Sequence, residues 1–303
     1  MDQPPRGPAR LQAGRDRAAY WTYRSIATFF QSLPAPVASG LATAGGLTMS
    51  ELWRKKRPQV RANLRRVVGP TMSDAELEHL VVKAFDSYAR YWVEGARLTT
   101  LRPKDVFDLF SIEGYERVEE EMAKHRGIIL ALPHLGCWDL GGLWLTLKGN
   151  PMTTVVEPLE PPALFEWFRA QREALGLTIH SFEPDTPAKL IATLRAGRLV
   201  GLVADRDLVG NGVEVEFFGE KTRLPAGAAV LALRTGAPLF PCAVYQRRGG
   251  RGHGLIHPPL VIERTGRLRT DVAAMTQMLA AEFEDLIRAA PEQWHMFQPN
   301  WPG

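Results

Sequence analysis

A histidine and an aspartate lie five positions apart, directly after an apolar segment of the chain. His134 follows Pro133 at the end of the run 128–132, and Asp139 comes at the expected start of a helix. A strand-to-helix junction holds reactive side chains at the exposed tip of a rigid scaffold. The spacing suits a carboxylate that turns back to one imidazole nitrogen, so that the other can take a proton from a hydroxyl. The motif predicts acid–base chemistry, with a purely structural His–Asp pair as the alternative.

Small residues surround the histidine. Gly136 allows another group to approach the backbone closely, and Gly141 and Gly142 permit tight packing or ligand contact at the start of the helix. Cys137 raises the alternative of a cysteine hydrolase, but its neighbours match no such signature and a small buried thiol is expected. Cys242 is the second of only two cysteines. Neither a disulfide framework nor a zinc site is therefore expected, and a reducing cytoplasm fits.

A second group of charges follows the apolar segment 199–204. The sequence Asp-Arg-Asp at 205–207 places charge at the end of a strand, where open α/β sheets usually carry their sites. Further on, alternation along the segment 213–219 would put Glu214 and Glu216 on one strand face and the valines on the other. A solvated strand face is the alternative interpretation.

Basic residues are clustered, although the net charge is only +4. Acidic residues are missing from Arg54 to Arg66, a run typical of a solvated helix face. An anionic membrane surface or a phosphorylated ligand is the alternative, and nucleic acid is disfavoured because no binding motif accompanies the charge. Arg172 and Arg223 are candidates for a phosphate clamp.

The scaffold predicted for these residues is an α/β fold with a mostly parallel central sheet flanked by helices. Strands and helices alternate from residue 111 onward, and a helical layer precedes them. We expect a disordered tail over residues 1–19 and a single domain over 20–303. Within it, 20–110 would form a helical, membrane-proximal layer and 111–303 the catalytic core. No signal peptide and no run of 18 apolar residues is found, which predicts a soluble or peripheral protein.

The helical layer has two recognisable features. The stretch 21–33 carries an aromatic face that suits core packing or a membrane interface. Ser73-Asp-Ala-Glu76 forms a capping box before a long apolar stripe, so a helix is expected to start there.

Several segments, in order along the chain, resemble one protein family. They are His134-x4-Asp139, Val156–Leu159 with Arg172–Gly176, Ala204–Arg206 with Gly212–Gly219, Leu224–Gly227, Thr235–Pro238 and Pro291–Pro299. The set resembles the bacterial lipid A biosynthesis acyltransferase branch of the glycerophospholipid acyltransferase superfamily over roughly residues 20–301. Within that branch, Glu214 and the Trp294-His-Met ending resemble members that acylate phosphatidylinositol mannosides.

The resemblance implies a peripheral enzyme on the cytoplasmic face of the cell membrane. It would move a palmitoyl-type chain from acyl-coenzyme A to a mannose hydroxyl of a glycolipid acceptor. His134 would be the general base, Asp139 its orienting partner and Glu214 the third catalytic carboxylate. Glu216 is the alternative to Glu214 in that role.

The same resemblance places Arg172 near the donor, whereas binding roles for Arg206 and Arg223 are our own hypotheses. A thioester is already activated, so no cofactor and no metal are expected. Partners would be acyl-coenzyme A, the glycolipid and an anionic membrane surface. The competing functions are acylation of a lipid A precursor or lysophospholipid and non-catalytic binding of lipid or membrane.

Overall fold

A central sheet of seven strands organises the protein in the computed structural model, which describes residues 7–158 and 160–301. Its strand order is β1-β9-β8-β2-β5-β3-β4, and all neighbouring strands are parallel except β8 and β9. The strands are β1 (Phe110–Glu113), β2 (Ile128–Leu132), β3 (Met152–Val156), β4 (Thr178–Ser181), β5 (Leu199–Val203), β8 (Leu239–Gln246) and β9 (Gly252–Ile256). The predicted α/β class with a mostly parallel sheet is confirmed.

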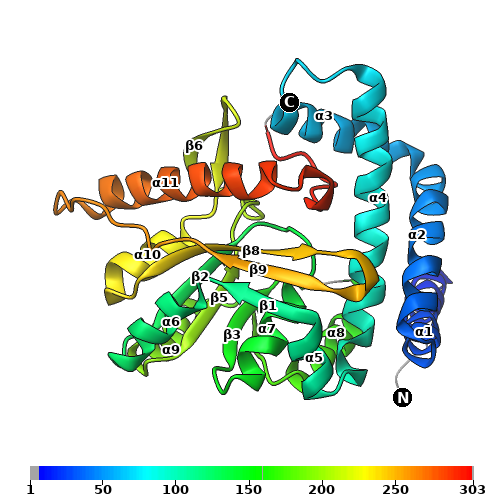
Figure 1. Ribbon diagram of the computed structural model, residues 1–303, viewed down its shortest axis with the longest axis horizontal. Coiled ribbons are helices and arrows are strands. Elements are labelled where there is room, and N and C mark those ends of the chain that lie inside the picture. The colour runs from blue at the N-terminus through cyan, green and yellow to red at the C-terminus, as the bar shows by residue number, and fades with distance from the viewer. Residues whose placement is uncertain (1–6, 159, 302–303) are drawn as a thin grey trace.

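Helices cover both faces of this sheet (Figure 1). Figure 1 shows α11 above the sheet, and α5 and α7 below it. The helices of the core are α5 (Pro103–Leu109), α6 (Tyr115–Ala123), α7 (Trp138–Leu147), α8 (Pro162–Ala174), α9 (Thr186–Arg195), α10 (Gly227–Thr235) and α11 (Leu268–Arg288). A separate antiparallel hairpin, β6 (Val213–Phe217) and β7 (Glu220–Leu224), packs on α11.

Strand β2 shows why this architecture follows from the sequence. All five of its residues are apolar and all five are buried, as expected for a central parallel strand covered on both faces. Alternation divides them between two cores: Ile129 and Ala131 contact the core below α10 and α11, whereas Ile128, Leu130 and Leu132 contact the core around α7. The residue that follows the strand is therefore fixed by packing on both sides.

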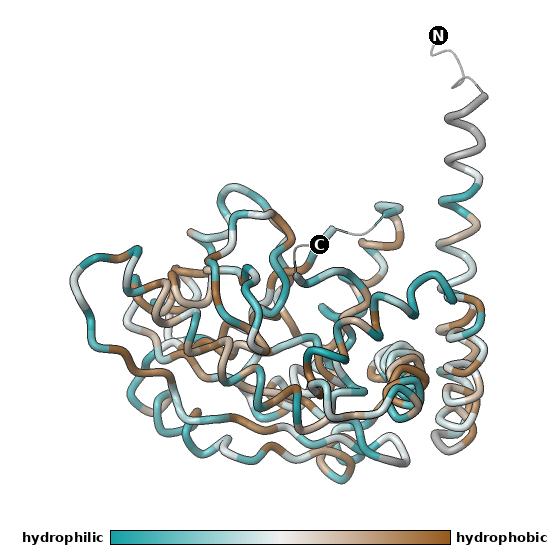
Figure 2. Tube along the Cα trace, turned by 90° about the horizontal axis from the view of Figure 1, so that it is seen from above, coloured by the Kyte–Doolittle hydropathy of each residue, from teal (hydrophilic) through white to brown (hydrophobic). Residues whose placement is uncertain are grey.

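The N-terminal layer consists of helices that stand at one end of the sheet (Figure 1). They are α1 (Gly7–Ser32), α2 (Ala35–Leu52), α3 (Arg57–Val68) and α4 (Asp74–Arg97). The expected disordered tail is wrong for residues 7–19, which belong to α1, while residues 1–6 lie outside the described residues. This segment is rich in strong helix formers, namely Ala, Leu, Gln and Arg. They follow Pro8, and proline is tolerated in the first turn of a helix. Figure 2 shows α1 extending beyond the rest of the molecule.

Helix α4 begins with the predicted capping box. Ser73 accepts a hydrogen bond from the backbone N–H of Glu76, and the Glu76 carboxylate accepts one from the backbone N–H of Ser73. The side-chain bond from Ser73 lowers the pKa of Glu76. The cap fixes where α4 starts, and α4 carries Ser87, Tyr91 and Glu94 to the site.

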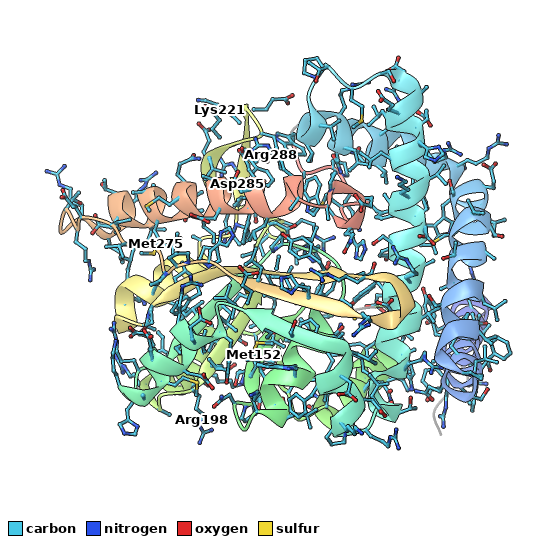
Figure 3. All side chains as sticks on the ribbon, in the orientation of Figure 1. Met152, Arg198, Lys221, Met275, Asp285 and Arg288 are labelled. Atoms are coloured by element: carbon cyan, nitrogen blue, oxygen red, sulfur yellow. The ribbon has the colours of Figure 1, made fainter. Side chains whose placement is uncertain are left out.

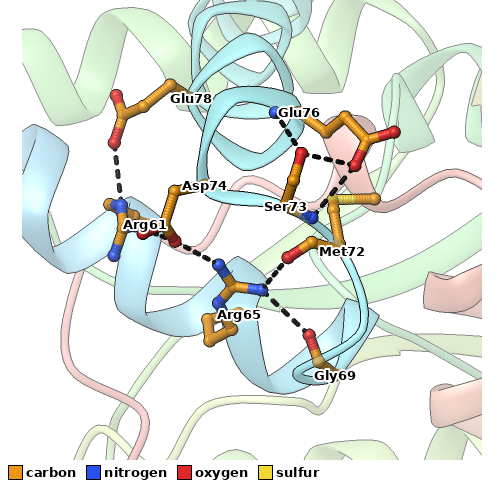
Figure 4. A network of polar contacts seen from close by, with 8 residues as sticks. All are labelled: Arg61, Arg65, Gly69, Met72, Ser73, Asp74, Glu76 and Glu78. Carbon is orange, nitrogen blue, oxygen red and sulfur yellow. Dashed lines mark hydrogen bonds and ion pairs between the residues drawn. The ribbon is translucent and has the colours of Figure 1, made fainter.

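Three of the seven basic residues in the run, Arg57, Arg61 and Arg65, join α3 to acids of α4, and Figure 4 shows two of them. Arg61 contacts Asp74 and Glu78, and Arg65 contacts Asp74 together with the carbonyl oxygens of Gly69 and Met72. Further pairs join Arg57 to Glu51 and Glu78, and Arg66 to Glu220. The acids come from outside the run, so the sequence pattern hides this neutralisation. These pairs engage part of the positive charge of Arg54–Arg66, and its binding to an anionic membrane surface stays a prediction.

Candidate active site

The register of two neighbouring strands brings His134 to a carboxylate. Strands β2 and β5 are parallel, with Leu132 opposite Val203. His134 is two residues after Leu132, and Asp205 is two residues after Val203. The two residues therefore lie side by side at the carboxyl edge of the sheet. Their backbones stay paired, because the N–H of Ala204 donates to the carbonyl of Leu132 at 2.9 Å.

Asp205 holds both the ring and the backbone of His134. Its Oδ1 lies 2.5 Å from Nδ1 of His134, and its Oδ2 accepts the backbone N–H of His134 at 2.9 Å. The indole N–H of Trp294 donates to the same Oδ2 at 2.7 Å. A neutral imidazole facing a carboxylate through Nδ1 carries its proton there, which leaves Nε2 as an acceptor. Nε2 makes no hydrogen bond within the described part of the chain, and the His134 side chain is partly exposed.

The hydrogen bonds and the charge around Asp205 keep its carboxyl group ionised. Complete burial raises the pKa of the carboxyl, but the charge of His134 and the hydrogen bonds from His134 and Trp294 outweigh it, so the pKa lies below its usual value. Asp205 is therefore a buried carboxylate whose charge depends on the imidazole beside it.

Asp139 has a different partner from the one its spacing predicts. It binds Arg172, with 2.8 Å between Oδ1 and the guanidinium Nε and 3.2 Å between Oδ2 and an Nη. The hydroxyl of Tyr91 lies 3.4 Å from Oδ2. Asp139 therefore does not accept the hydrogen bond that its spacing predicts from the His134 ring, because it lies in the first turn of α7 and is directed toward α8, which carries Arg172.

Asp139 keeps Arg172 charged although the guanidinium is largely buried. Arg172 is largely buried, which disfavours its charge, yet the adjacent carboxylate of Asp139 keeps its pKa above the ordinary value. Burial and the charge of Asp139 raise the pKa of Tyr91 well above its ordinary value, so its hydroxyl stays protonated. Asp139 and Arg172 thus form a charged pair next to the His134 site.

The loop that carries His134 is held by the C-terminal segment. Gly136 has φ +61°, and a Cβ there would lie 1.9 Å from the carbonyl oxygen of Val244, so the predicted close approach at this glycine is confirmed. The N–H of Gly136 donates to the carbonyl of Gln293, and the N–H of His295 donates to the carbonyl of His134.

Two side-chain networks anchor that segment in turn. Gln293 exchanges two hydrogen bonds with the backbone of Gln246 on β8, and the hydroxyl of Ser87 bridges Gln246 and the His295 ring. Burial lowers the pKa of His295 to about 3. His295 is therefore neutral at physiological pH and supports the loop without adding charge to it.

Cys137 does not have the environment of a nucleophile. The thiol is buried, and burial raises its pKa well above the ordinary value, so little thiolate forms near neutral pH. Burial also raises the pKa of Cys242 to about 12. Both thiols act as small apolar groups in the core around α7.

The hairpin β6–β7 carries three other predicted site residues, Glu214, Glu216 and Arg223. Alternation is confirmed, since Glu214 and Glu216 are exposed while Val215 and Phe217 are buried. Glu214 pairs with Lys221, the residue labelled at the tip of the hairpin in Figure 3, and this bond lowers the pKa of Glu214. Glu214 makes no hydrogen bond or ion pair with His134 among the described residues, and its role as a third catalytic carboxylate stays a prediction.

The remaining candidates lie in separate places. Arg223 faces Glu214 across the hairpin and lines a polar pocket with Asp207. Arg206 follows Asp205 directly and is bonded to Glu157. Of the predicted binding residues, Arg172 is the one whose contacts reach the His-x4-Asp motif.

An apolar pocket opens beside the His134 loop. It encloses about 750 Å³ including its mouth and lies between α7 and the sheet. Trp138 lines it and meets the His134 ring edge to face, with centroids 5.6 Å apart. Gly141 and Gly142 line it too, as does Met152, labelled beneath the sheet in Figure 3. A Cβ at Gly141 would lie 3.0 Å from the Val244 side chain and one at Gly142 would lie 3.1 Å from Leu177, so both glycines allow tight packing at the pocket wall.

Asp205 and Trp294 were not selected as site residues from the sequence. Asp205 stands at the end of a predicted strand, which was a usable signal. Its pairing with His134 depends on which strands are neighbours, and sequence periodicity does not reveal that. Within the described residues no cluster of three or more His, Cys, Asp and Glu side chains could hold a metal ion.

Comparison with known proteins identifies the family. The family model described as bacterial lipid A biosynthesis acyltransferase matches residues 11–302. The chain belongs to this family. It is 41% identical over 248 residues to the phosphatidylinositol mannoside acyltransferase of Mycobacterium tuberculosis H37Rv, covering 80% of this chain and 76% of that protein.

Other relatives extend the comparison. The Mycolicibacterium smegmatis phosphatidylinositol mannoside acyltransferase is 38% identical over 275 residues, covering 89% of this chain and 87% of that protein. The Escherichia coli K12 lipid A biosynthesis lauroyltransferase is 26% identical over 281 residues, covering 91% and 89%. The protein is an acyltransferase of the lipid A acyltransferase family, with homologues that are phosphatidylinositol mannoside acyltransferases.

Proposed function

We propose that this acyltransferase moves a palmitoyl-type chain from acyl-coenzyme A to a mannose hydroxyl of a phosphatidylinositol mannoside. The observation that carries the proposal is the pair His134–Asp205, whose imidazole meets the ring of Trp138, a residue that lines an apolar pocket. The identity of 38–41% to relatives with that acceptor in their name favours the mannoside over lipid A, whose named enzymes are 25–26% identical.

The reaction needs one base and no redox change. Nε2 of His134 takes the proton of the mannose hydroxyl as its oxygen attacks the thioester carbonyl carbon. The tetrahedral oxyanion then collapses, the carbon–sulfur bond breaks, and the coenzyme A thiolate takes the proton back from His134. A positioned base of this kind contributes about 10²–10⁴-fold.

Asp205 serves this mechanism by fixing the imidazole and by stabilising the imidazolium formed during attack. Its hydrogen bonds to the ring and to the backbone of His134 prevent the ring from turning. Because the carboxylate of Asp205 is fully buried, its attraction to the imidazolium is stronger than it would be in water.

The acyl chain would enter the pocket between α7 and the sheet. Leu132 and Trp138 belong to its lining and are close to His134 in the chain, so a thioester carbonyl at the base has its alkyl chain next to an apolar wall. Each buried methylene contributes about 0.8 kcal/mol to binding. We therefore assign this pocket to the donor chain.

The membrane is the source of the acceptor in this proposal. Helices α1 and α2 expose large apolar side chains, among them Trp21, Ile26, Phe29 and Leu47. An exposed apolar face at one end of the molecule suits docking on the cytoplasmic membrane surface. None of the described helices is long and apolar enough to cross a bilayer.

An acyl-transfer assay with several acceptors tests the proposal. Purified protein receives palmitoyl-coenzyme A with a phosphatidylinositol mannoside, a lipid A precursor, a lysophospholipid or no acceptor, and acylated lipid and free coenzyme A are measured. We expect transfer to the mannoside, a loss of about 10²–10⁴-fold in His134→Ala, and wild-type rates in Cys137→Ala. Preference for another acceptor would overturn the mannoside assignment, and full activity in His134→Ala would overturn the mechanism.

A further inference from the structure

A second apolar pocket lies on the side of Arg172 that faces the N-terminal layer. It encloses about 780 Å³ including its mouth and is bounded by α1, α4 and α8. In Figure 1, α8 lies beside the lower part of α4. Three aromatic rings form one wall: Trp92 and Phe168 have centroids 5.4 Å apart, and Tyr23 lies 6.1–6.2 Å from both.

The two apolar pockets meet at one ion pair. Asp139 and Arg172 belong to the lining of both, so a charged pair stands where they adjoin. The first pocket lies against the sheet, next to the ring of Trp138 that faces His134. The second pocket is lined by Tyr91, whose ring stacks on Trp138 with centroids 4.4 Å apart. The Tyr91 ring therefore stands between the second pocket and Trp138, the ring that meets His134.

We propose that the second pocket holds an acyl chain of the acceptor glycolipid. This inference rests on the proposed function, in which two lipid substrates must be bound at once. A donor chain begins at the reacting carbonyl, so it needs the pocket adjoining His134. An acceptor reacts through its headgroup, so its acyl chains lie at a distance from the base. The second pocket is also separated from His134, so its position suits such a chain.

The position of the pocket in the fold supports the same occupant. Tyr23 and Ile26 line it on α1, and both are also among the exposed apolar side chains of that helix. Figure 2 shows the apolar residues of α1 at the edge of the molecule. The pocket is thus continuous with the surface assigned to the membrane, from which a lipid chain enters without crossing water.

Gly95 offers a variant that fills the pocket without disturbing the fold. It lies in α4 and lines the pocket, and a Cβ there would meet nothing within 4 Å. Leucine is also a better helix former than glycine. Gly45→Leu is the matched control, because Gly45 is an exposed helical glycine of the same layer with nothing within 4 Å of a Cβ.

The experiment compares a diacylated acceptor with its deacylated, water-soluble headgroup, using palmitoyl-coenzyme A as donor. In Gly95→Leu we expect the KM for the diacylated acceptor to rise about tenfold or more, with a smaller rise in Gly95→Ala. Transfer to the deacylated headgroup and the KM for the donor should stay as in the wild type. Gly45→Leu should match the wild type with both acceptors.

Several outcomes would overturn the inference. Equal losses with both acceptors, or a raised KM for the donor alone, would assign the pocket to another role. An unchanged KM in a Gly95→Leu protein that melts like the wild type would leave the pocket without a lipid chain. If the wild type acylates neither the diacylated acceptor nor the deacylated headgroup, the proposed function itself is wrong. If the variants still acylate the deacylated headgroup, the proposed function holds and only the role of the second pocket is tested.

Discussion

Two buried carboxylates lie close to the His134 loop, and each has a different basic partner. Asp205 binds the imidazole that takes up a proton in the proposed reaction. Asp139 binds a guanidinium that is always charged. Asp205 can therefore stabilise a charge that appears only in the transition state, while Asp139 stabilises a charge that never changes. In the proposed mechanism, Asp205 therefore has a catalytic role and Asp139 a structural one.

The largest difference is expected for Asp205→Asn. The amide keeps the size of the side chain but removes the charge that balances the imidazolium. We expect kcat to fall about 10³-fold, with a KM for the donor close to that of the wild type. Steady-state kinetics with both substrates measure this effect. A kcat within threefold of the wild type would remove Asp205 from the mechanism.

Asp139→Asn should instead reduce stability, because it leaves the largely buried guanidinium of Arg172 without its carboxylate. Loss of one partner from a buried pair costs about 3–5 kcal/mol. Replacing both partners in Asp139→Leu/Arg172→Met should restore much of the free energy of unfolding, which denaturant titration measures. If the double variant is less stable than Asp139→Asn, a structural role for the pair is wrong.

Trp294→Phe tests how far Asp205 depends on its second donor. The indole bond to Oδ2 is lost while the aromatic ring stays, and hydrogen bonds to charged groups contribute about 1.5–3 kcal/mol. We expect kcat to fall about tenfold, less than in Asp205→Asn. A loss as large as that of Asp205→Asn would show that the indole, rather than the carboxylate, positions His134.

A third carboxyl group, Glu94, extends the comparison, because its hydrogen-bond partner is a neutral amide instead of an imidazole or a guanidinium. Its side chain accepts a bond from Gln246, and burial raises its pKa to about 7. The folded state therefore keeps a proton that the unfolded state releases above about pH 4.5, so stability falls as pH rises from 4.5 to 7. His295 acts in the opposite sense, since its pKa of about 3 makes stability fall as pH drops below 6.5.

The two effects oppose each other in the wild type between pH 4.5 and 6.5. In Glu94→Gln the contribution of Glu94 disappears, so the free energy of unfolding should rise more steeply with pH over this window. Urea titrations at several pH values measure the slope. An identical slope in wild type and variant would show that Glu94 is ionised in the folded protein.

The sequence predicted the scaffold of the site better than its contacts. An apolar run fixed β2, the capping box fixed the start of α4, and Gly136 marked the close backbone approach. Each of these features depends on residues near one another in the chain or on the size of a single side chain. Periodicity and local hydrogen bonding therefore suffice to predict them.

The partner of His134 was not predictable by the same reasoning. The spacing of five residues favoured Asp139, but the turn into α7 directs that carboxylate toward Arg172. Asp205 reaches His134 through the pairing of β2 with β5, 71 positions apart in the chain. The basic run misled in a similar way, because the acids that neutralise it come from α4 and the hairpin. Non-local pairing decides both outcomes.

The hydrogen bonding of the His134 ring tests the central claim most directly. In a protein carrying ¹⁵N-labelled histidine, NMR distinguishes a ring protonated at Nδ1 from one protonated at Nε2. The account predicts an Nδ1–H tautomer for resting His134 that is lost or redistributed in Asp205→Asn and retained in Asp139→Asn. A tautomer unchanged in Asp205→Asn but altered in Asp139→Asn would contradict it and return Asp139 to the role that its spacing first suggested.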